Sequence, residues 1–439
     1  MKRLLIALLI VFWLPALAQT KAEDVKTFTL ANGMKFLILE DNSIPNANMY
    51  FFYKVGSRNE YTGITGLSHF FEHMMFNGAK KYGPKMFDRH MEYSGGSNNA
   101  YTTQNLTVYT DWFPASAIEI IFDLEADRIS SLSIDPKMVE SERGVVLSER
   151  STGLENSPWR MLDEAVNATA FQEHPFHWPV IGYENDIKNW TKEDLEYYFK
   201  TYYAPNNCVV VISGNVKLAE VKKLADKYLS VIPAANPAKP VHLVEPPQTG
   251  ERRVVVKKEV NTPYLMLGYH VPEAKHADYY ALNILSAILT SGNSSRLYSA
   301  LVDKKQLATE IGSDYSPSFD PTLFQIYGIT ADSTSTSVLA FENAIYEEIE
   351  KIQKDGISEN ELQKIKNQKQ MQFYKATETI DGKSNNLGTY EVFFGDYKKM
   401  YEEPGAYAKV SLQDIKRVAN QYFKKSNRTV GIIKANTEE

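Results

Sequence analysis

Alternating apolar and polar residues near the start of the chain predict a β-hairpin. The runs at 27–30 and 34–40 flank Asn32-Gly33, a dipeptide that readily supplies the positive φ values of a tight type I′ turn. The apolar run at 48–55 predicts a third strand. Helical spacing of apolar residues then predicts helices at 66–77, 84–93, 115–130 and 136–150. The first half of the chain therefore combines a run of strands with a run of helices.

One pattern occurs twice in the chain, 220 residues apart. Each copy has a Ser or Thr three residues before an Asp, then a helical stretch, an aromatic pair, an Asn and an apolar strand. The first copy runs from Thr191 to Ile212, and the second runs from Ser411 to Ile432. In both copies the hydroxyl and the carboxylate can cap the free N–H groups that begin a helix. Because all these features recur in register, we expect a duplicated domain.

A proline-rich stretch divides the chain almost in half. Residues 233–250 contain repeated prolines and lack helical periodicity, which is typical of a linker. The chain is also longer than one hydrophobic core usually supports. We therefore predict an N-terminal metal-binding domain at 19–232, a linker at 233–250 and a C-terminal domain at 251–439. The expected fold is α+β, with two tandem homologous domains that each have a mainly antiparallel sheet and helices packed on one face.

The first residues predict a signal peptide. Lys2 and Arg3 precede an apolar run at 4–14 and the small-x-small sequence Ala16-Leu17-Ala18, so residues 1–18 fit a cleaved export signal. A membrane anchor is the alternative, but this run is too short to span a bilayer and no later run is apolar for long enough. We therefore expect a periplasmic or secreted protein without a stable membrane anchor.

Composition excludes two further possibilities. Cys208 is the only cysteine, so no disulfide can form within the chain even after export. The formal net charge is −6 and no basic run is present, which argues against nucleic acid as a partner.

Two histidines on one predicted helix indicate a metal site. His69 and His73 are four residues apart, so their imidazoles project from the same helix face and can bind one ion. Glu72 lies beside them and is not needed as a ligand, which is where a base for a metal-bound water must lie. Catalytic zinc takes three protein ligands and leaves one position open. The predicted helix at 136–150 offers Glu142 and Glu149 on one face, and we favour Glu149 as the ligand and Glu142 as the carboxylate that orients an imidazole.

A second interpretation of these residues is open at this point. Short motifs recur by accident, so the histidines could be ordinary helix residues and the carboxylates a solvated face. The surrounding sequence has to decide between the two interpretations.

The motif His69-Phe70-Phe71-Glu72-His73 lies within a chain that resembles the pitrilysin/insulysin family of zinc metallopeptidases, the inverzincins. It looks like the metal-bearing subunit of the short-chain, processing-peptidase-like members. The resemblance covers nearly the whole chain after the signal peptide. The matching segments are 66–78, 95–102, 142–149, His174-Pro175, 203–206 and 294–297.

The resemblance implies a role for each residue of the motif segments. It makes Zn²⁺ the cofactor, and its site residues are His69, His73 and Glu149 as ligands, Glu72 as general base and Glu142 as the supporting carboxylate. It also implies that Asn99, Ala100 and Thr102 belong to an edge strand to which an extended peptide substrate adds. A purely structural strand is the alternative for those three residues, because ladder bonds come from the backbone.

The chain departs from the family pattern in its second half. No H-x-x-E-H occurs there, and the aligned residues 281–289 are mostly apolar, so we expect one metal site per chain. Active members place an Arg and a Tyr seven residues apart in the half without metal, where they bind the substrate carbonyl. Val302 and Thr309 stand at those positions here. Three nearby side chains lack the required spacing, namely Arg296, Tyr298 and Tyr315.

These observations predict a zinc-dependent endopeptidase subunit that hydrolyses short or unfolded peptides. Because Val302 and Thr309 replace the Arg/Tyr pair, we expect a heterodimer with a homologous subunit that carries the pair and lacks the zinc motif, with a homodimer still open. A non-catalytic peptide-binding or assembly subunit is the alternative function, and a structural protein with accidental histidines is the third.

Overall fold

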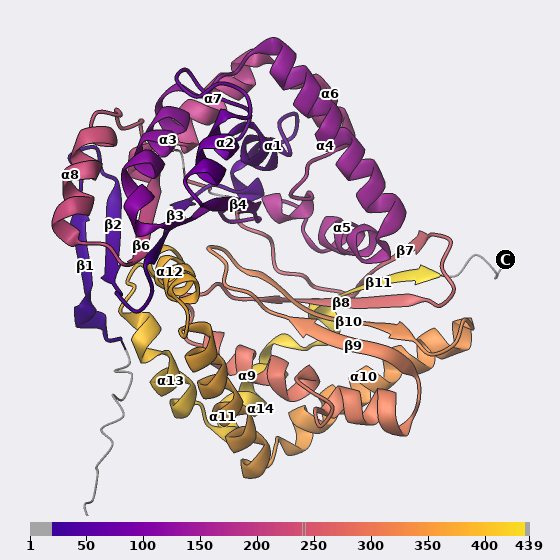
Figure 1. Cartoon of the computed structure of the whole chain (residues 1–439). Helices are drawn as coiled ribbons and strands as arrows, with labels where there is room; N and C mark the ends of the chain where they lie inside the picture. The colour runs from indigo at the N-terminus through magenta and orange to yellow at the C-terminus, as the bar shows by residue number, and fades with distance from the viewer. Residues whose placement is uncertain (1–19, 239, 242, 435–439) are drawn as a thin grey trace, which may run out of the picture.

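Two β-sheets, one in each half of the chain, form the framework of the protein (Figure 1). The computed structural model describes residues 20–238, 240–241 and 243–434, so the predicted signal peptide at 1–18 lies outside the described residues. The first sheet has the order β1-β2-β6-β3-β5-β4 and the second has the order β7-β11-β8-β10-β9. The strands are β1 Val25–Thr29, β2 Lys35–Glu40, β3 Asn46–Tyr53, β4 Ser97–Thr102, β5 Thr107–Pro114, β6 Cys208–Gly214, β7 Arg252–Lys257, β8 Tyr264–Val271, β9 Ala308–Asp314, β10 Thr322–Thr330 and β11 Arg428–Lys434.

Strand pairing repeats between the two sheets. Each sheet contains one parallel pair, β2 with β6 and β7 with β11, and the other pairs are antiparallel. β4 and β9 take equivalent places at the edge of their sheets. This repetition confirms two tandem α+β units with mainly antiparallel sheets.

Both halves also contain helices. They are α1 Leu67–Met74, α2 Met86–Tyr93, α3 Ile118–Ser131, α4 Pro136–Asn156, α5 Pro158–Ala170, α6 Glu184–Asn189, α7 Lys192–Tyr202 and α8 Leu218–Tyr228 in the first half, and α9 Tyr279–Thr290, α10 Ser335–Asp355, α11 Glu359–Ala376, α12 Ile380–Thr389, α13 Lys399–Lys409 and α14 Leu412–Tyr422 in the second. Both predicted capping boxes are present, because the hydroxyls of Thr191 and Ser411 each accept a bond of 3.1 Å from the N–H of the Asp three residues later. None of the helices in the described part of the chain is long and apolar enough to cross a membrane.

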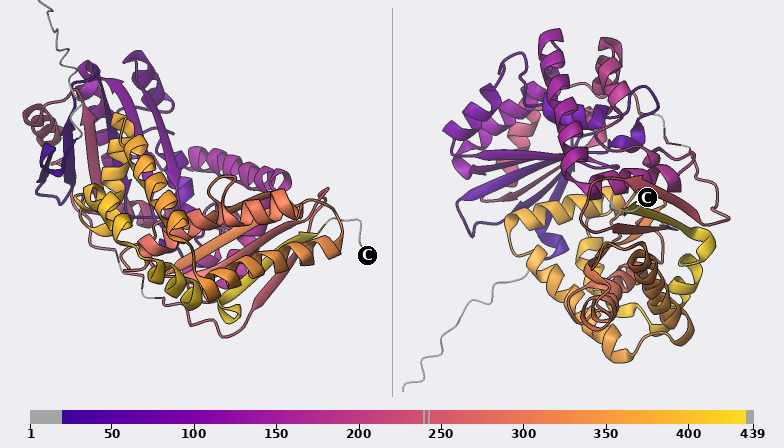
Figure 2. Two further views of the ribbon diagram at one scale, coloured as in Figure 1. Left: turned by 90° about the horizontal axis from the view of Figure 1, so that it is seen from below. Right: turned by 90° about the vertical axis from the view of Figure 1, so that its right-hand side faces the viewer.

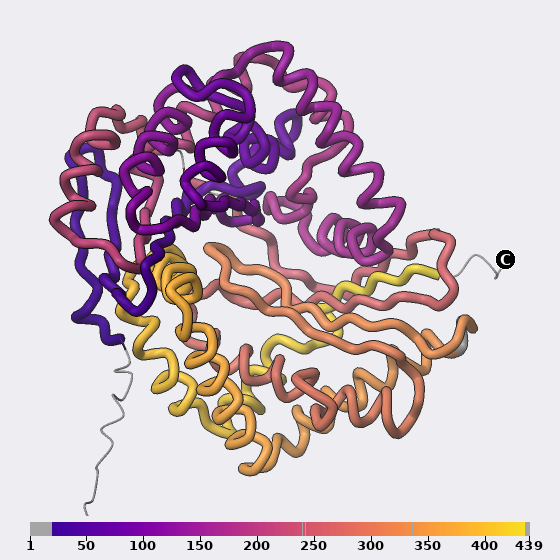
Figure 3. Tube along the Cα trace, in the orientation of Figure 1, coloured from indigo at the N-terminus to yellow at the C-terminus, as the bar shows by residue number. Residues whose placement is uncertain are grey.

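In each half, one helix packs on the sheet of the other half, as Figures 1 and 3 show. α5 packs on β7, β8 and β11, with Leu162 and Val166 fully buried. α12 packs in turn on β3 and β6. Both contacts need a glycine: a Cβ on Gly431 would lie 2.3 Å from Val166, and a Cβ on Gly388 would lie 2.0 Å from the ring of Phe52. The exchange joins the halves, whose two sheets are inclined to each other in the left view of Figure 2.

The first hairpin forms, but its turn differs from the prediction. Thr29 pairs with Lys35, so the loop is wider than a two-residue turn, and of Asn32-Gly33 only Gly33 has a positive φ, of 89°. The type I′ prediction was therefore wrong. The buried side chain of Asn32 instead donates to the carbonyl oxygens of Leu229 at 2.8 Å and Ile232 at 2.9 Å. Contacts distant in sequence decided the conformation of this loop.

α4 is longer than its pattern predicted, since it continues from residue 150 to Asn156. Its last turn receives support from the second half of the chain. The Lys258 ammonium donates to the carbonyl oxygens of Leu154 at 2.9 Å and Glu155 at 2.7 Å, groups that a helix end leaves unpaired.

The proline-rich segment at 233–250 contains neither helix nor strand among its described residues. Glu245 fastens it to the first half, because its carboxylate accepts bonds from the backbone N–H groups of Gln172, Glu173 and His174 at 2.9 to 3.1 Å. The segment is therefore anchored where α5 ends.

Candidate metal centre

A buried carboxylate and a glycine fix the start of α1. Glu60 accepts bonds from the N–H groups of Gly66 at 2.7 Å and Ser68 at 2.8 Å, at the end of the helix where such groups lack partners. Burial raises the pKa of Glu60 to about 8. Gly66 has a φ of +92°, and a Cβ there would lie 2.4 Å from the carbonyl oxygen of Ile181. Only glycine fits this approach, so residue 66 determines where α1 begins.

The apolar face of α1 holds the helix against the core. Phe70, Phe71 and Met74 are fully buried, and the Tyr109 hydroxyl donates to the Phe71 carbonyl at 3.0 Å. His69 and His73 lie on a different face, with their ring centroids 4.7 Å apart. Burial of one face therefore presents both imidazoles together on another.

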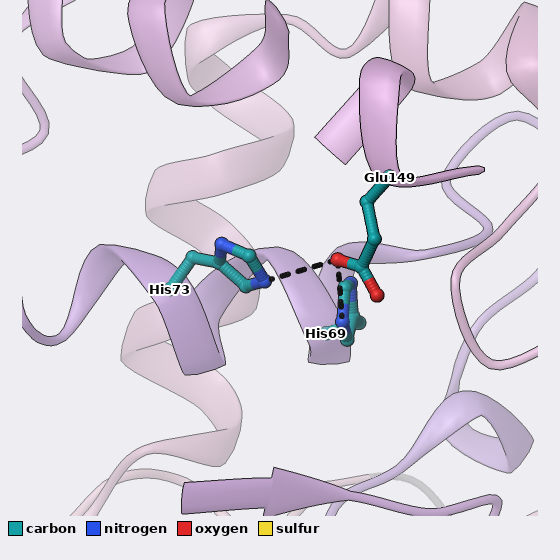
Figure 4. Close-up of side chains that lie close together, drawn as sticks. All are labelled: His69, His73 and Glu149. Carbon is teal, nitrogen blue, oxygen red and sulfur yellow. Dashed lines mark ion pairs between the residues drawn. The ribbon is translucent and has the colours of Figure 1, made fainter. Parts of the chain in front are cut away.

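Glu149 of α4 meets these two imidazoles (Figure 4). Its Oε2 lies 3.6 Å from Nε2 of His69 and 3.5 Å from Nε2 of His73, and the three ligand atoms lie within 4.8 Å of one another. These distances are long for hydrogen bonds. Ligand atoms about 2.0–2.2 Å from one tetrahedral zinc ion stand roughly 3.3–3.6 Å apart. The two imidazoles and the carboxylate, with their spacing, therefore fit zinc.

Glu142 lies on the same face of α4 as Glu149, about two turns earlier, and contacts the Nδ1 side of the His73 ring. Its Oε1 lies 2.7 Å from His73 Nδ1, and its Oε2 accepts from the Asn77 amide at 2.6 Å. An Nδ1–H bonded in this way leaves His73 Nε2 facing Glu149, in the tautomer that a metal ligand needs.

Burial and the neighbouring carboxylates affect the two imidazoles differently. Burial lowers the pKa of His69 to about 4, which favours the neutral form that binds metal. Burial also lowers the pKa of His73, but the hydrogen bond with Glu142 and the nearby carboxylate of Glu149 outweigh it and raise the value to about 9. Metal binding must therefore displace a proton from His73.

Glu72 and the edge strand β4 lie next to each other beside the triad. Burial raises the pKa of Glu72, and the polar groups of Thr102 partly counter that rise. Because side chains alternate along a strand, Ala100 and Thr102 lie on one face of β4 and Asn99 lies on the other, more exposed face. The three predicted substrate residues thus share a strand with a free edge but do not share a face.

The two positions that we expect to replace the family's Arg/Tyr pair, Val302 and Thr309, lie in the second half. Val302 is partly buried against the C-terminal core, and Thr309 is an exposed residue of β9. Arg296 is held by Glu361 at 2.7 Å, and the Tyr315 hydroxyl donates to the Pro272 carbonyl at 2.8 Å. Arg296 and Tyr315 are therefore already engaged within the second half.

Sequence reasoning missed Arg160, whose Nη1 lies 3.8 Å from Oε1 of Glu149. It also missed a cavity of about 480 Å³ that opens beside the triad between the two halves. Its lining includes His69, Glu149 and Thr102 from the first half and Asp314 and Gln325 from the second. No spacing rule reveals either feature, because Arg160 belongs to another helix and the cavity depends on how the halves pack.

The two tandem domains and the three possible metal ligands are features of a metallopeptidase fold, and comparison with known families agrees. Residues 35–183 match the family described as "Insulinase (Peptidase family M16)", and residues 189–369 match the family described as "Peptidase M16 inactive domain". The chain belongs to peptidase family M16.

Several relatives are similar over nearly their full length. The chain is 32% identical over 421 residues to "Zinc protease PqqE" of Helicobacter pylori, covering 95% of this chain and 94% of that protein. It is 24% identical to "Mitochondrial-processing peptidase subunit beta" of Lentinula edodes, covering 90% of this chain and 86% of that one. Among solved structures, a protease from Helicobacter pylori superposes with a TM-score of 0.89 at 31% identity, covering 93% of this chain and 99% of that one.

Proposed function

We propose that this protein is a zinc-dependent endopeptidase subunit that hydrolyses short or unfolded peptides. The observation that carries the proposal is the convergence of His69, His73 and Glu149, with their ligand atoms within 4.8 Å of one another and Glu72 on the same helix as both histidines. The relatives named zinc proteases support the same chemistry.

His69, His73 and Glu149 would hold the zinc ion, which would supply Lewis-acid chemistry for polarising a scissile carbonyl and for making water a stronger acid. Glu72 takes the proton of the attacking water and later delivers it to the leaving amine. The burial that raises the pKa of Glu72 brings its basicity closer to what a general base needs at neutral pH. Glu142 holds His73 through Nδ1, so the imidazole cannot rotate away.

The free edge of β4 supports a peptide substrate. Among the residues that the structure describes, β4 pairs only with β5, so its other edge leaves backbone donors and acceptors for an added strand, next to Glu72. Recognition by backbone pairing requires an extended segment. Short or unfolded peptides meet that requirement readily, because their backbone groups are not already paired within a fold.

The proposal includes a partner chain. Val302 and Thr309 cannot bind a carbonyl oxygen as an Arg/Tyr pair would, so a homologous subunit lacking the zinc motif supplies the pair in a heterodimer. The basic, apolar and small-residue pattern at 1–18 supports export to the periplasm or beyond.

Replacing the proposed base tests the mechanism. Glu72→Gln should retain zinc and lower turnover of a quenched fluorescent peptide about 100- to 10,000-fold, the range that general-base catalysis contributes. Glu220→Gln removes an exposed carboxylate on α8 and serves as the control. Each protein is assayed alone and after co-purification from the native source, with zinc quantified in parallel.

Two results would contradict the proposal. Wild-type turnover by Glu72→Gln removes the assigned base. Zinc-loaded protein that binds peptides and cleaves none, with or without a co-purified partner, favours the non-catalytic peptide-binding subunit instead.

A further inference from the structure

Arg160 places a guanidinium at the edge of the metal triad. Its Nη1 lies 3.8 Å from Oε1 of Glu149, whereas the other oxygen, Oε2, is the one near the two imidazoles. That distance is too long for a hydrogen bond, and the Arg160 side chain is 59% exposed. The guanidinium N–H groups are therefore accessible to a ligand at the site.

Gly153 makes room for this guanidinium on α4. It lies one helical turn after Glu149, and a Cβ on Gly153 would stand 2.6 Å from Nη1 of Arg160. The backbone of Arg160 is fixed as well, because its N–H donates to the Ser157 hydroxyl at the start of α5. The side chain thus reaches Glu149 across a gap that any larger residue at position 153 would fill.

Arg160 also lies where two cavities meet. It lines the cavity of about 480 Å³ between the halves and a second cavity of about 820 Å³ along α4, and Glu149 lines both. The neighbouring Arg150 is already bonded to Glu164 at 2.8 and 3.2 Å. Two arginines line the first cavity. Arg150 is hydrogen-bonded to a carboxylate, whereas the guanidinium of Arg160 has no side-chain hydrogen bond among the described residues.

The charge of the first cavity narrows the choice of ligand. Four acidic residues line it, Glu149, Asp163, Glu164 and Asp314, against two arginines, Arg150 and Arg160, so the lining has more carboxyl groups than guanidinium groups. An acidic peptide side chain is disfavoured there. A main-chain carbonyl oxygen adds no charge, occurs in every peptide and accepts well from a guanidinium.

We propose that Arg160 is a substrate-binding residue whose guanidinium donates to a main-chain carbonyl oxygen of the peptide in the cavity beside the triad. This inference rests on the proposed peptidase function. It assigns the chain a cationic substrate contact of its own, besides any that a partner supplies.

Arg160→Gln tests the charge. Loss of one hydrogen bond to a charged donor should lower kcat/KM about 10- to 100-fold, and the change should appear mainly in KM because the contact exists in the bound peptide. Arg160→Lys should restore part of the loss. Zinc affinity, measured by competition with a chromophoric chelator, should stay within about twofold because Glu149 keeps its ligand oxygen.

Gly153→Ala tests the geometry without removing the charge. The added methyl pushes the flexible end of Arg160 aside, so KM should rise although the arginine remains. Gly144→Ala is the matched control, since it adds the same methyl to the same helix and meets no atom within 4 Å. Both alanines favour helix, so thermal stability should be equal to wild type or higher.

Binding of a labelled peptide to Glu72→Gln protein separates this inference from the proposed function. Weaker binding in the Glu72→Gln/Arg160→Gln double variant supports the inference even if the wild type cleaves no peptide. Absence of cleavage by the wild type would contradict only the peptidase function. Peptide binding and kcat/KM unchanged by Arg160→Gln overturn the inference alone. A parallel fall in zinc affinity also overturns it, because Arg160 would then act through Glu149.

Discussion

Glu142 is the residue whose replacement most directly probes how the metal centre is held. Both of its oxygens are used, Oε1 at 2.7 Å from His73 Nδ1 and Oε2 at 2.6 Å from the Asn77 amide. Glu142→Gln keeps the size of the side chain but replaces one oxygen with an NH₂ group. That NH₂ must then face either the imidazole N–H or the Asn77 amide, so two donors oppose each other. The ring of His73 loses its fixed orientation.

The expected result is a 10- to 100-fold loss of zinc affinity, which corresponds to about 1.4–2.8 kcal/mol. Competition with a chromophoric chelator, followed by metal analysis of the dialysed protein, measures the loss. Glu140→Gln provides the control on the same helix, because the Glu140 side chain is 78% exposed and forms its ion pair with Arg143, at 3.2 Å, and not with a residue of the triad. Zinc affinity within twofold of wild type in both Glu142→Gln and Glu142→Ala would refute the role given to this carboxylate.

Four further outcomes follow from the structure. Leu162→Ala empties a fully buried site between α5 and the second sheet and should lower the free energy of unfolding by about 2–5 kcal/mol in urea denaturation; a loss under 1 kcal/mol would contradict the exchanged-helix core. Burial raises the pKa of Asp111 well above its ordinary value, with Glu125 adding to the rise, so wild-type stability should fall as pH rises above about 4 and Asp111→Asn should flatten that slope in denaturation at pH 5 to 8. Gly66→Ala should cost at least about 1–3 kcal/mol and weaken zinc binding as well, which paired denaturation and chelator titrations would show. Zinc at 100 times its Kd should add about 2.7 kcal/mol of stability, so a melting temperature unmoved by chelation would count against the metal centre.

Local sequence patterns predicted the elements that carry the chemistry. The i, i+4 spacing of His69 and His73 follows from helix geometry, and their helix forms because Phe70, Phe71 and Met74 bury its other face. The paired caps at Thr191 and Ser411 likewise depend on residues three apart. Such features need only neighbouring residues, so the sequence alone contains them.

Contacts between distant residues decided the rest. The Asn32 side chain donates to carbonyl oxygens about 200 residues away, and the expected turn does not form. Lys258 likewise donates to a carbonyl oxygen in the last turn of α4.

The sequence by itself determined the duplicated α+β plan, the helix face that bears the two histidines and the carboxylates available to them. Tertiary structure decided that Glu149 meets those imidazoles, that each half covers the other's sheet, and that Arg160 reaches the site over Gly153. The physical reason is the range of the forces involved. Helix periodicity and capping act within one or two turns, whereas burial of apolar faces and pairing of buried polar groups depend on segments that only folding brings together.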